Sequence, residues 1–347
     1  MSFSPERRKS FCSSRREEAH FQRLALQLNS STVCRTICPV VTRTYSTQKS
    51  GIPPIPTEEI EVLLRDSAPS IWRHIAIIPL GNNQAFSGVY AKSNGYEGIL
   101  TAAHSANQFL AKERVALAVS EVSHRLIVNS TDFDHVRIGY DETEGYTNSQ
   151  PDLSFVIIRN EKLLQLIRSL KLSFYDLDIA ASRAKEVFLN PEKPLAKFNW
   201  SVAGCPREKV EIANQLIDGQ SHEIITSPSV LIQGNLVEYD YDFANNFDYL
   251  KFYMGSGFEE FPDDYDGMSG GGIWYQMFVT DDGINFTVKP ILAGIARWQS
   301  EMTVKKGYKV RPIIGHAWVS IYAHVRRVLR EKRAAANRAS EKPPQNS

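Results

Sequence analysis

The clearest sign of chemistry in the sequence is a glycine-rich stretch, residues 267–272, which reads GMSGGG. A serine that attacks a carbonyl carbon needs an exposed hydroxyl and nearby backbone N–H groups that point at the developing oxyanion. Flanking glycines allow the unusual backbone angles of such a turn and the close approach of a substrate. Ser269 is therefore a candidate nucleophile. The same pattern also fits a glycine-rich hairpin turn, so at this point both interpretations stand.

A second candidate, His104, follows the apolar run Gly98–Thr101 and two alanines. Small neighbours leave an imidazole at the wall of a cleft free to form hydrogen bonds through both ring nitrogens. His104 is therefore a candidate general base. The other histidines lack this context and are interpreted as packed or surface residues.

A third candidate, Asp152, immediately precedes the almost continuous apolar run Leu153–Ile158. An aspartate beside a catalytic histidine accepts the Nδ1–H, fixes the tautomer and stabilises the imidazolium. Asp132, Asp134 and Asp141 suit this role less well, because none of them leads directly into so apolar a run.

Short strands must position these side chains. Runs rich in Val, Ile, Tyr and Phe, separated by Asn, Gly, Asp and Ser, predict strands along most of the chain. In the first part they are His74–Leu80, Phe86–Lys92, Gly98–Thr101, Val115–Val119, Arg125–Val128, His135–Gly139 and Leu153–Ile158. In the second part they are Asn199–Gly204, Glu223–Ile225, Ser229–Tyr239, Tyr249–Tyr253, Gly271–Phe278 and Lys289–Ile295.

Three segments predict helices instead. A brief helix is expected at Glu58–Arg65, and apolar residues at helical spacing predict another at Glu161–Lys171. A third, Ala317–Arg333, carries one apolar stripe, which we expect to pack against the second half of the chain.

These elements divide the chain into five parts. We expect a leader at 1–51, a first β-barrel lobe with the histidine and aspartate at 58–160, and a linker with a helix at 161–197. A second β-barrel lobe with the serine and a closing helix follows at 198–333, and a disordered tail at 334–347.

Composition limits the partners that the chain can have. The net charge is +1, so charge gives no indication of a nucleic acid partner, and no apolar run approaches the roughly 18 residues of a membrane helix. Three of the four cysteines (Cys12, Cys34 and Cys38) lie near the start, so Cys205 has no disulfide partner in the body of the chain. This usage favours a reducing compartment.

Localisation depends on the leader, which is rich in Arg and Ser and poor in acids. The expected location is cytoplasmic, with the leader as a disordered extension. The alternative is a mitochondrial protein whose residues 1–45 are a transit peptide, because the sequence RTYS at 43–46 resembles the cleavage sites of such peptides.

Taken together, the three motifs resemble the trypsin/chymotrypsin family of serine proteases, in which the chain order is His, Asp, Ser. The matching residues are TAAH at 101–104, Asp152-Leu153 before a strand, and Gly267-x-Ser269-Gly270-Gly271. The resemblance spans roughly residues 70–333. It implies an all-β fold, a chymotrypsin-like double β-barrel with a linker helix and a C-terminal helix.

The resemblance also implies an activity, that of a serine-type endopeptidase of the trypsin-like (peptidase S1) kind. Ser269 would attack a peptide carbonyl, His104 would take and return the proton, and Asp152 would orient the histidine. The backbone N–H groups of Gly267 and Ser269 would form the oxyanion hole. The substrate would be a polypeptide, and no metal or organic cofactor would be required.

Two departures from the family are informative. Digestive and clotting members carry an acid just before the nucleophile, which pairs with a newly cut N-terminus, whereas this chain has Met268. The body of the chain also lacks the cysteines for disulfides. Both features place the chain closer to the bacterial, viral and organellar members.

Two residues bear on substrate preference. The resemblance places Asp263 at the base of the specificity pocket, which would favour a basic residue before the cut. However, Asp263 belongs to an acidic cluster that equally fits a solvated loop. Arg297, on the strand that would line the pocket, would instead favour an acidic side chain or fill the site.

Three alternatives remain. The chain could be a catalytically inactive or gated protease-fold binding module. It could be an esterase, since Gly267-x-Ser269-x-Gly271 formally fits the α/β-hydrolase elbow, but that fold places the histidine last and alternates strands with helices. The motifs could also be coincidental in an unrelated all-β protein.

Overall fold

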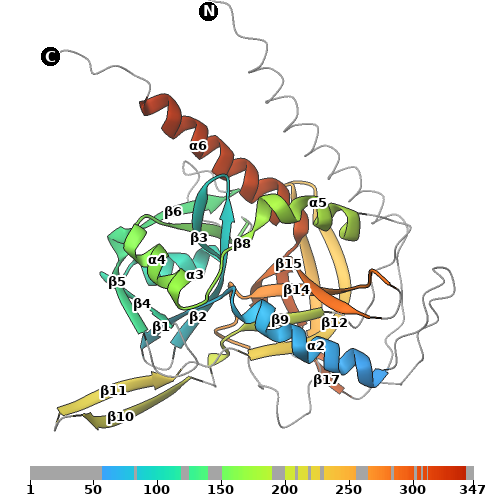
Figure 1. The fold of residues 1–347 in the computed structure, drawn as a ribbon, viewed down its shortest axis with the longest axis horizontal. Coiled ribbons are helices and arrows are strands. Elements are labelled where there is room, and N and C mark those ends of the chain that lie inside the picture. Colours follow the sequence, from blue (N-terminus) through green and yellow to red (C-terminus); the bar gives the residue numbers. More distant parts are fainter. Residues whose placement is uncertain are drawn as a thin grey trace, which may run out of the picture.

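The computed structural model describes residues 57–81, 84–118, 125–139, 151–189, 200–207, 210–217, 220–226, 230–254, 265–282, 285–300, 303–305, 308–310 and 312–340. Two antiparallel sheets follow one another along the chain, with helices between and around them (Figure 1). The predicted leader at 1–51 lies outside the described residues.

The candidate histidine follows one strand of the first sheet, and the candidate aspartate immediately precedes another. The strand order of this sheet is β5-β4-β1-β2-β3-β7-β6, and β8 pairs in parallel with β2. Among the described residues the two outer strands, β5 and β6, pair with no further strand, so this sheet is an open half-barrel. The strands are β1 (Ile75–Gly81), β2 (Gln84–Ser93), β3 (Tyr96–Thr101), β4 (Arg114–Ala118), β5 (Arg125–Asn129), β6 (Phe133–Ile138), β7 (Leu153–Ile158) and β8 (Tyr175–Asp176).

The second sheet closes into a barrel, and the candidate serine lies just before one of its strands. The order around the barrel is β12-β13-β18-β15-β14-β9. These strands are β9 (Trp200–Gly204), β12 (Val230–Asp242), β13 (Phe247–Met254), β14 (Gly272–Val279), β15 (Thr287–Gln299) and β18 (Pro312–His316). Two separate hairpins join strands of this half, β10 (Glu211–Ile217) with β11 (Gln220–Thr226), and β16 (Thr303–Lys305) with β17 (Tyr308–Val310). The first of these hairpins extends away from the body (Figure 1).

Apart from the short 3-10 helix η1 (Ser130–Asp132), five helical segments of the described chain surround the sheets. They are α2 (Thr57–Trp72), α3 (Ala103–Leu110), α4 (Glu161–Ser169), α5 (Leu177–Phe188) and a C-terminal helix that begins with a π-helical turn, η3 (Ser320–Val325), and continues as α6 (Arg326–Ser340). Although α2 directly precedes the first sheet, it packs against β15 of the barrel. There Gln276 on β14 donates a hydrogen bond to the Ser67 hydroxyl, at 2.7 Å.

The larger hydrophobic core joins the two sheets. It combines side chains of the first sheet with those of the barrel, α5 and the C-terminal helix. The indole of Trp318 lies between the rings of Tyr239 and Phe188, with centroids at 4.4 and 4.6 Å. Burial of three large rings in one stack stabilises the closing helix against the barrel.

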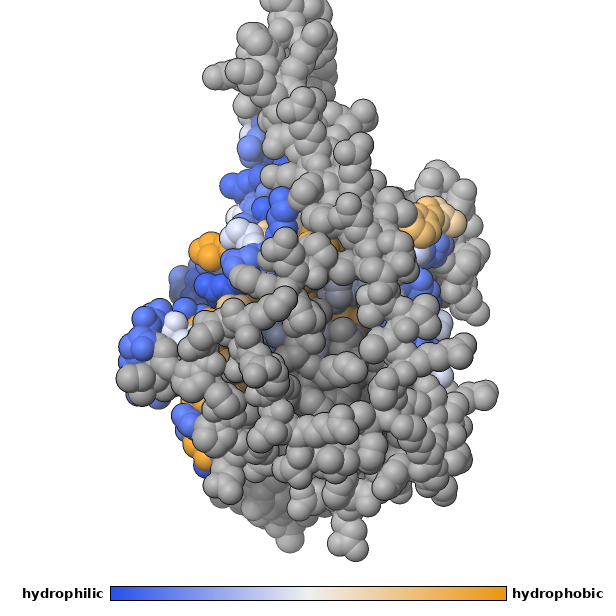
Figure 2. All heavy atoms as spheres, turned by 90° about the vertical axis from the view of Figure 1, so that its right-hand side faces the viewer, coloured by the Kyte–Doolittle hydropathy of each residue, from blue (hydrophilic) through white to orange (hydrophobic). Residues whose placement is uncertain are grey.

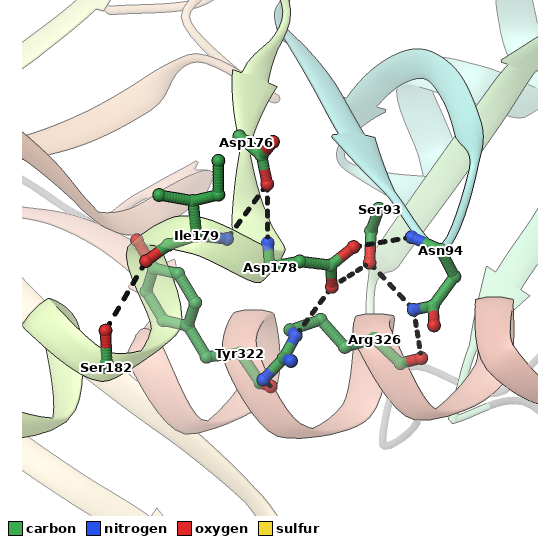
Figure 3. Close-up of polar contacts among 8 residues, drawn as sticks. All are labelled: Ser93, Asn94, Asp176, Asp178, Ile179, Ser182, Tyr322 and Arg326. Atoms are coloured by element: carbon green, nitrogen blue, oxygen red, sulfur yellow. Dashed lines mark hydrogen bonds and ion pairs between the residues drawn. The ribbon is translucent and has the colours of Figure 1, made fainter.

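Figure 3 shows a polar cluster that links three distant parts of the chain. Asp178, in the first turn of α5, accepts hydrogen bonds from Ser93 and from the backbone N–H of Asn94, at 2.9 and 2.7 Å. It also accepts a bond of 2.9 Å from Nε of Arg326 on α6. Asn94 in turn donates through its side chain to the Arg326 carbonyl, at 3.0 Å. The β2–β3 turn, α5 and α6 are therefore held at one carboxylate.

The described part of the surface shows how its polar and apolar residues are distributed. Seen from the side, this part is mainly hydrophilic, and its hydrophobic residues lie in small separate areas (Figure 2). Within the described ranges, no helix has the length and apolar character needed to cross a bilayer.

The fold class expected from the sequence is confirmed: a mostly β chain with two antiparallel sheets, helices between them and a helix at the C-terminal end. The linker contains two helices, α4 and α5, where the sequence predicts one. The boundaries of several elements differ from the predicted ones, notably those of two helices. The helix expected at Glu58–Arg65 continues to Trp72, with Pro69 in its last turn. The C-terminal helix continues to Ser340, into the segment for which the sequence predicts a disordered tail. Alanines at 334–336 have the highest helix propensity, which accounts for this extension.

Candidate active site

The turn from β3 into α3 positions His104. Strand β3 ends at Thr101, Ala102 is extended, and the helix begins at Ala103, so His104 lies in its first turn. About a third of its side chain is exposed (34%), which leaves one face of the ring open to a bound molecule.

Strand pairing brings Asp152 to this turn. Strand β7 is antiparallel to β3, with Ser154 opposite Thr101, so the residues just before β7 lie beside the start of α3. Asp152 Oδ1 accepts a 2.8 Å bond from the His104 backbone N–H, and Oδ2 lies 2.6 Å from Nδ1 of the ring. Two contacts to one residue fix both the carboxylate and the ring.

The electrostatics of Asp152 keep it ionised. Burial raises the pKa of its carboxyl, but hydrogen bonds from His104 and the charge of its ring outweigh burial and lower the pKa below the usual value. A nearly inaccessible carboxylate (3% exposed) that is charged at neutral pH can hold an imidazolium next to it.

His316 supports Asp152 from the barrel. The backbone N–H of Asp152 donates a bond of 3.1 Å to Nε2 of this fully buried histidine on β18. Burial, followed by the charge of Arg297, lowers the pKa of His316 to about 3, so its ring is neutral and able to accept. The sequence analysis placed His316 among the packed histidines, and its contact with Asp152 links residues too far apart in the chain for pattern reasoning to find.

A glycine-dependent turn positions Ser269. Gly267 and Gly270 have φ of +89° and +87°, a region that favours glycine. The turn is fixed by two hydrogen bonds of 2.7 and 2.8 Å, from Gly270 N–H to the Ala296 carbonyl and from Gly271 N–H to the Met268 carbonyl. Met268 itself is buried in the core. The glycine-rich stretch is therefore a tight turn that leads into β14.

Ser269 and His104 both lie against β2. The Ser269 carbonyl accepts a bond of 3.2 Å from the N–H of Ser87, and the next residue back, Phe86, places its ring edge-on to that of His104, with centroids 6.4 Å apart. The Ser269 hydroxyl donates to the carbonyl of Arg297, at 2.9 Å. Within the described residues no hydrogen bond joins Ser269 to His104.

The two predicted oxyanion donors differ in their partners. The N–H of Gly267 donates to Oδ1 of Asp266 at 3.1 Å, and the Asp266 carboxylate also pairs with Arg207 at 3.3 Å. The N–H of Ser269 has no hydrogen-bond partner in the described part of the chain. The Ser269 N–H is thus open to a substrate oxygen, whereas the Gly267 N–H is bonded to the largely exposed side chain of Asp266.

The two residues expected at the substrate pocket have different outcomes. Asp263 lies outside the described residues. Arg297 is buried, with its Nε 3.7 Å from Oδ2 of Asp152 and its guanidinium 4.1 Å from the ring centre of the half-exposed Trp298. The pocket role of each residue stays a prediction. Sequence reasoning missed three features of this site: the helix α3, the contact of His316 with Asp152, and the position of Arg297 beside Asp152.

No grouping of metal ligands occurs in the described ranges, in the sense of three His, Cys, Asp or Glu side chains brought together. Cys205, predicted to have no disulfide partner, is a free buried thiol whose pKa burial raises to about 12.

Comparison with known proteins gives likenesses of fold only. No protein-family model matches the chain, and no curated protein sequence is significantly similar to it. Among solved structures, it is similar to neuropsin, a serine protease expressed in the limbic system of mouse brain, at 13% identity and a TM-score of 0.32, over 78% of this chain and 95% of that one. It is also similar to the Drosophila Grass clip serine protease of the Toll pathway, at 13% identity and a TM-score of 0.37, over 84% and 73%.

Proposed function

We propose that this protein is a serine endopeptidase that hydrolyses peptide bonds through Ser269, His104 and Asp152. The observation that carries the proposal is the pair of contacts by which buried Asp152 holds the backbone and the ring of His104. An aspartate that fixes a partly exposed histidine beside a serine turn is the arrangement that general-base activation of a serine requires.

In the proposed reaction, Nε2 of His104 takes the proton of the Ser269 hydroxyl as Oγ attacks the carbonyl carbon of a peptide bond. The N–H groups of Ser269 and Gly267 bind the oxyanion of the tetrahedral intermediate. The imidazolium then gives its proton to the amide nitrogen, the C–N bond breaks, and the amine product leaves. Water, deprotonated by His104, attacks the resulting ester, which releases the acid and restores the serine.

Two local changes are needed before attack. The Ser269 hydroxyl must exchange its bond to the Arg297 carbonyl for one to His104. The Gly267 N–H must exchange the exposed Asp266 carboxylate for the substrate oxygen. Both bonds that break involve groups within reach of solvent, so a bound peptide can replace them.

The same two bonds favour a gated form as the second candidate. A protein in which Ser269 stays bound to Arg297 and Gly267 to Asp266 would fold as a protease, would bind peptides and would not cleave them. The proposed polypeptide substrate is common to both candidates. A basic residue before the cut is expected if Asp263 forms the pocket base, and a peptide library without enrichment for Lys or Arg would contradict that assignment.

A fluorophosphonate probe tests the proposed function, because it phosphonylates serines activated by a neighbouring base. We expect labelling of the wild-type chain and its loss in both Ser269→Ala and His104→Ala. Ser182→Ala is the matched control, since Ser182 is an exposed serine on α5 whose loss should leave labelling unchanged. A folded wild-type chain, verified by circular dichroism, that takes no label would contradict the endopeptidase and favour the gated module.

A further inference from the structure

Arg297 carries a charge into the interior of the protein. Its side chain is buried beside the candidate active site (9% exposed). A buried guanidinium is strongly unfavourable unless it is paired. The carboxylate that it faces is that of Asp152, which is more deeply buried still (4% of its side chain exposed). Each of these charges therefore reduces the cost of burying the other.

A β-bulge places Arg297 there. On β15, Ala296 pairs with Gly315 of β18, but the next paired residue is Trp298, opposite Ile314, so Arg297 is the extra residue of the strand. A bulge interrupts the alternation of side chains and redirects the bulged residue. All residues from 291 to 297 are buried, so Arg297 ends the buried part of β15 and exposure resumes at Trp298.

Arg297 contacts both the proposed nucleophile and the proposed orienting aspartate. Its carbonyl accepts a hydrogen bond from the Ser269 hydroxyl. Its guanidinium faces Oδ2 of Asp152, the same oxygen that lies 2.6 Å from His104 Nδ1. The geometry points to Arg297 as a positioning residue, whose permanent charge holds the Asp152 carboxylate in the place where it orients His104. This inference rests on the proposed function of Ser269, His104 and Asp152.

The other ionisable groups around His104 do not supply this charge. His316 on β18 is neutral, and burial raises the pKa of Tyr249 on β13 to about 12, so it is neutral too. Arg137 on β6 is directed to the side chain of Asn107, on the same helix as His104. Among the described groups that contact Asp152, Arg297 is the fixed cation.

A cation beside the carboxylate has a consequence for the contact between Asp152 and His104. Loss of the Arg297 charge should leave the Asp152 carboxylate less firmly placed, so the contact of Oδ2 with Nδ1 of the His104 ring should weaken.

A double-mutant cycle tests the pairing without reference to catalysis. Arg297→Met should lower the melting temperature by about 5–10 °C in the wild-type background, because it removes the fixed cation beside the buried Asp152 carboxylate. In an Asp152→Asn background, Arg297→Met should lower the melting temperature by less than half of that amount. In the wild-type background, Arg297→Lys should give a melting temperature between those of the wild type and Arg297→Met. Equal losses in both backgrounds would mean that Arg297 acts through packing and would overturn the inference.

A spectroscopic readout completes the test. The Nδ1–H resonance of His104, assigned by its absence in His104→Ala, is compared by NMR at one fixed pH in the wild type, Arg297→Lys and Arg297→Met. We expect this resonance to shift upfield or broaden in Arg297→Met, because its hydrogen bond to Asp152 weakens, and to change less in Arg297→Lys. An unchanged resonance in Arg297→Met would overturn the inference. The NMR shift without fluorophosphonate labelling would refute the proposed function and leave the pairing intact.

Discussion

Gly270 occupies a position that excludes a side chain for two separate reasons. Its φ of +87° is unfavourable for residues with a Cβ, and a Cβ would collide with the Thr101 hydroxyl and the Ser87 carbonyl. Gly95 shares the first restriction, at φ +79°, but a Cβ there would meet only the end of Arg333, at 3.9 Å. Comparison of alanine substitutions at Gly95 and Gly270 therefore distinguishes the cost of backbone strain alone from the added cost of steric collision.

Gly270→Ala should therefore destabilise the protein by more than about 3 kcal/mol and abolish fluorophosphonate labelling, because strain and overpacking add. Gly95→Ala, the control, should cost about 1 kcal/mol and leave labelling intact. Urea unfolding of the two variants measures the difference. Similar losses would show that the neighbours of Gly270 move aside.

At this scale the sequence predicted residue types better than contacts. The glycines around Ser269 and the apolar run after Asp152 are local patterns, and the structure brings Asp152 to His104 as expected. The placement of Arg297 beside Asp152 depends on a bulge in β15, and that of His316 on the pairing of β18 with two other strands. Such tertiary arrangements leave no periodic signal in the sequence.

Among the elements, the C-terminal helix begins at a buried acid. Asp248 on β13 accepts hydrogen bonds from the backbone N–H groups of Val319 and Ser320, at 2.8 and 2.7 Å, so it caps the helix from another strand. Burial raises the pKa of Asp248 to about 6, although these hydrogen bonds act in the opposite direction.

This pKa gives the helix start a pH dependence. Because the pKa is higher in the folded state than in the unfolded state, the stabilising contribution of the protonated carboxyl is complete below about pH 4. It is lost as pH rises through about 6. Asp248→Asn removes the titration, so the stability of this variant relative to wild type should increase by about 2–3 kcal/mol from pH 4 to pH 7. Unfolding in urea across this range provides the measurement, and a constant difference would contradict the assigned pKa.

The elements themselves were predicted unevenly. Strands with alternating or continuous apolar residues were found, whereas α3 was missed because its 8 residues follow a strand directly and carry no side-chain cap. Strand β18 and the β10–β11 hairpin were missed in whole or in part. The helix expected to end at Arg65 continues to Trp72 as α2, where the apolar side chains of Ala68 and Ile71 are buried.

For the whole molecule, the cluster at Asp178 is the most direct test of how the parts are held together (Figure 3). Burial raises the pKa of Asp178, but its bonds to Arg326, Asn94 and Ser93 outweigh burial and lower the pKa. The carboxylate is therefore charged in the folded protein at neutral pH, and one side chain joins the β2–β3 turn to the closing helix.

Asp178→Asn should lower the free energy of unfolding at pH 7 by about 1–2 kcal/mol, because charge-assisted bonds to a partly exposed group are weakened. Since the pKa of Asp178 is depressed, the deficit should shrink as pH falls through that pKa. Glu238→Gln is the control: Glu238 forms an ion pair with Lys251 across neighbouring strands and is more than half exposed, so the loss of this pair should cost less than about 0.5 kcal/mol. Equal losses of unfolding free energy in Asp178→Asn and Glu238→Gln would mean that the Asp178 cluster contributes no more than an exposed ion pair.

At the largest scale the sequence predicted two β-rich halves and their order, since strand patterns stop and resume around the linker. It could not predict which half each terminal helix contacts, because an apolar stripe specifies burial and not a partner. The structure answers this question in an unexpected way: α2 packs on the barrel, and α6 reaches back to the first sheet.

The helices at the two ends of the described chain therefore each contact the opposite half of the fold. Through Ser67, α2 bonds to β14 of the second half, while Lys332 and Arg333 of α6 contact Asp134 and Tyr96 of the first. If the backbone were cut between residues 189 and 200, each fragment would keep a helix that belongs to the other fragment's surface. The halves would then behave as complementing fragments that reassociate, and neither would be a self-sufficient folding unit that evolution or an engineer could exchange on its own.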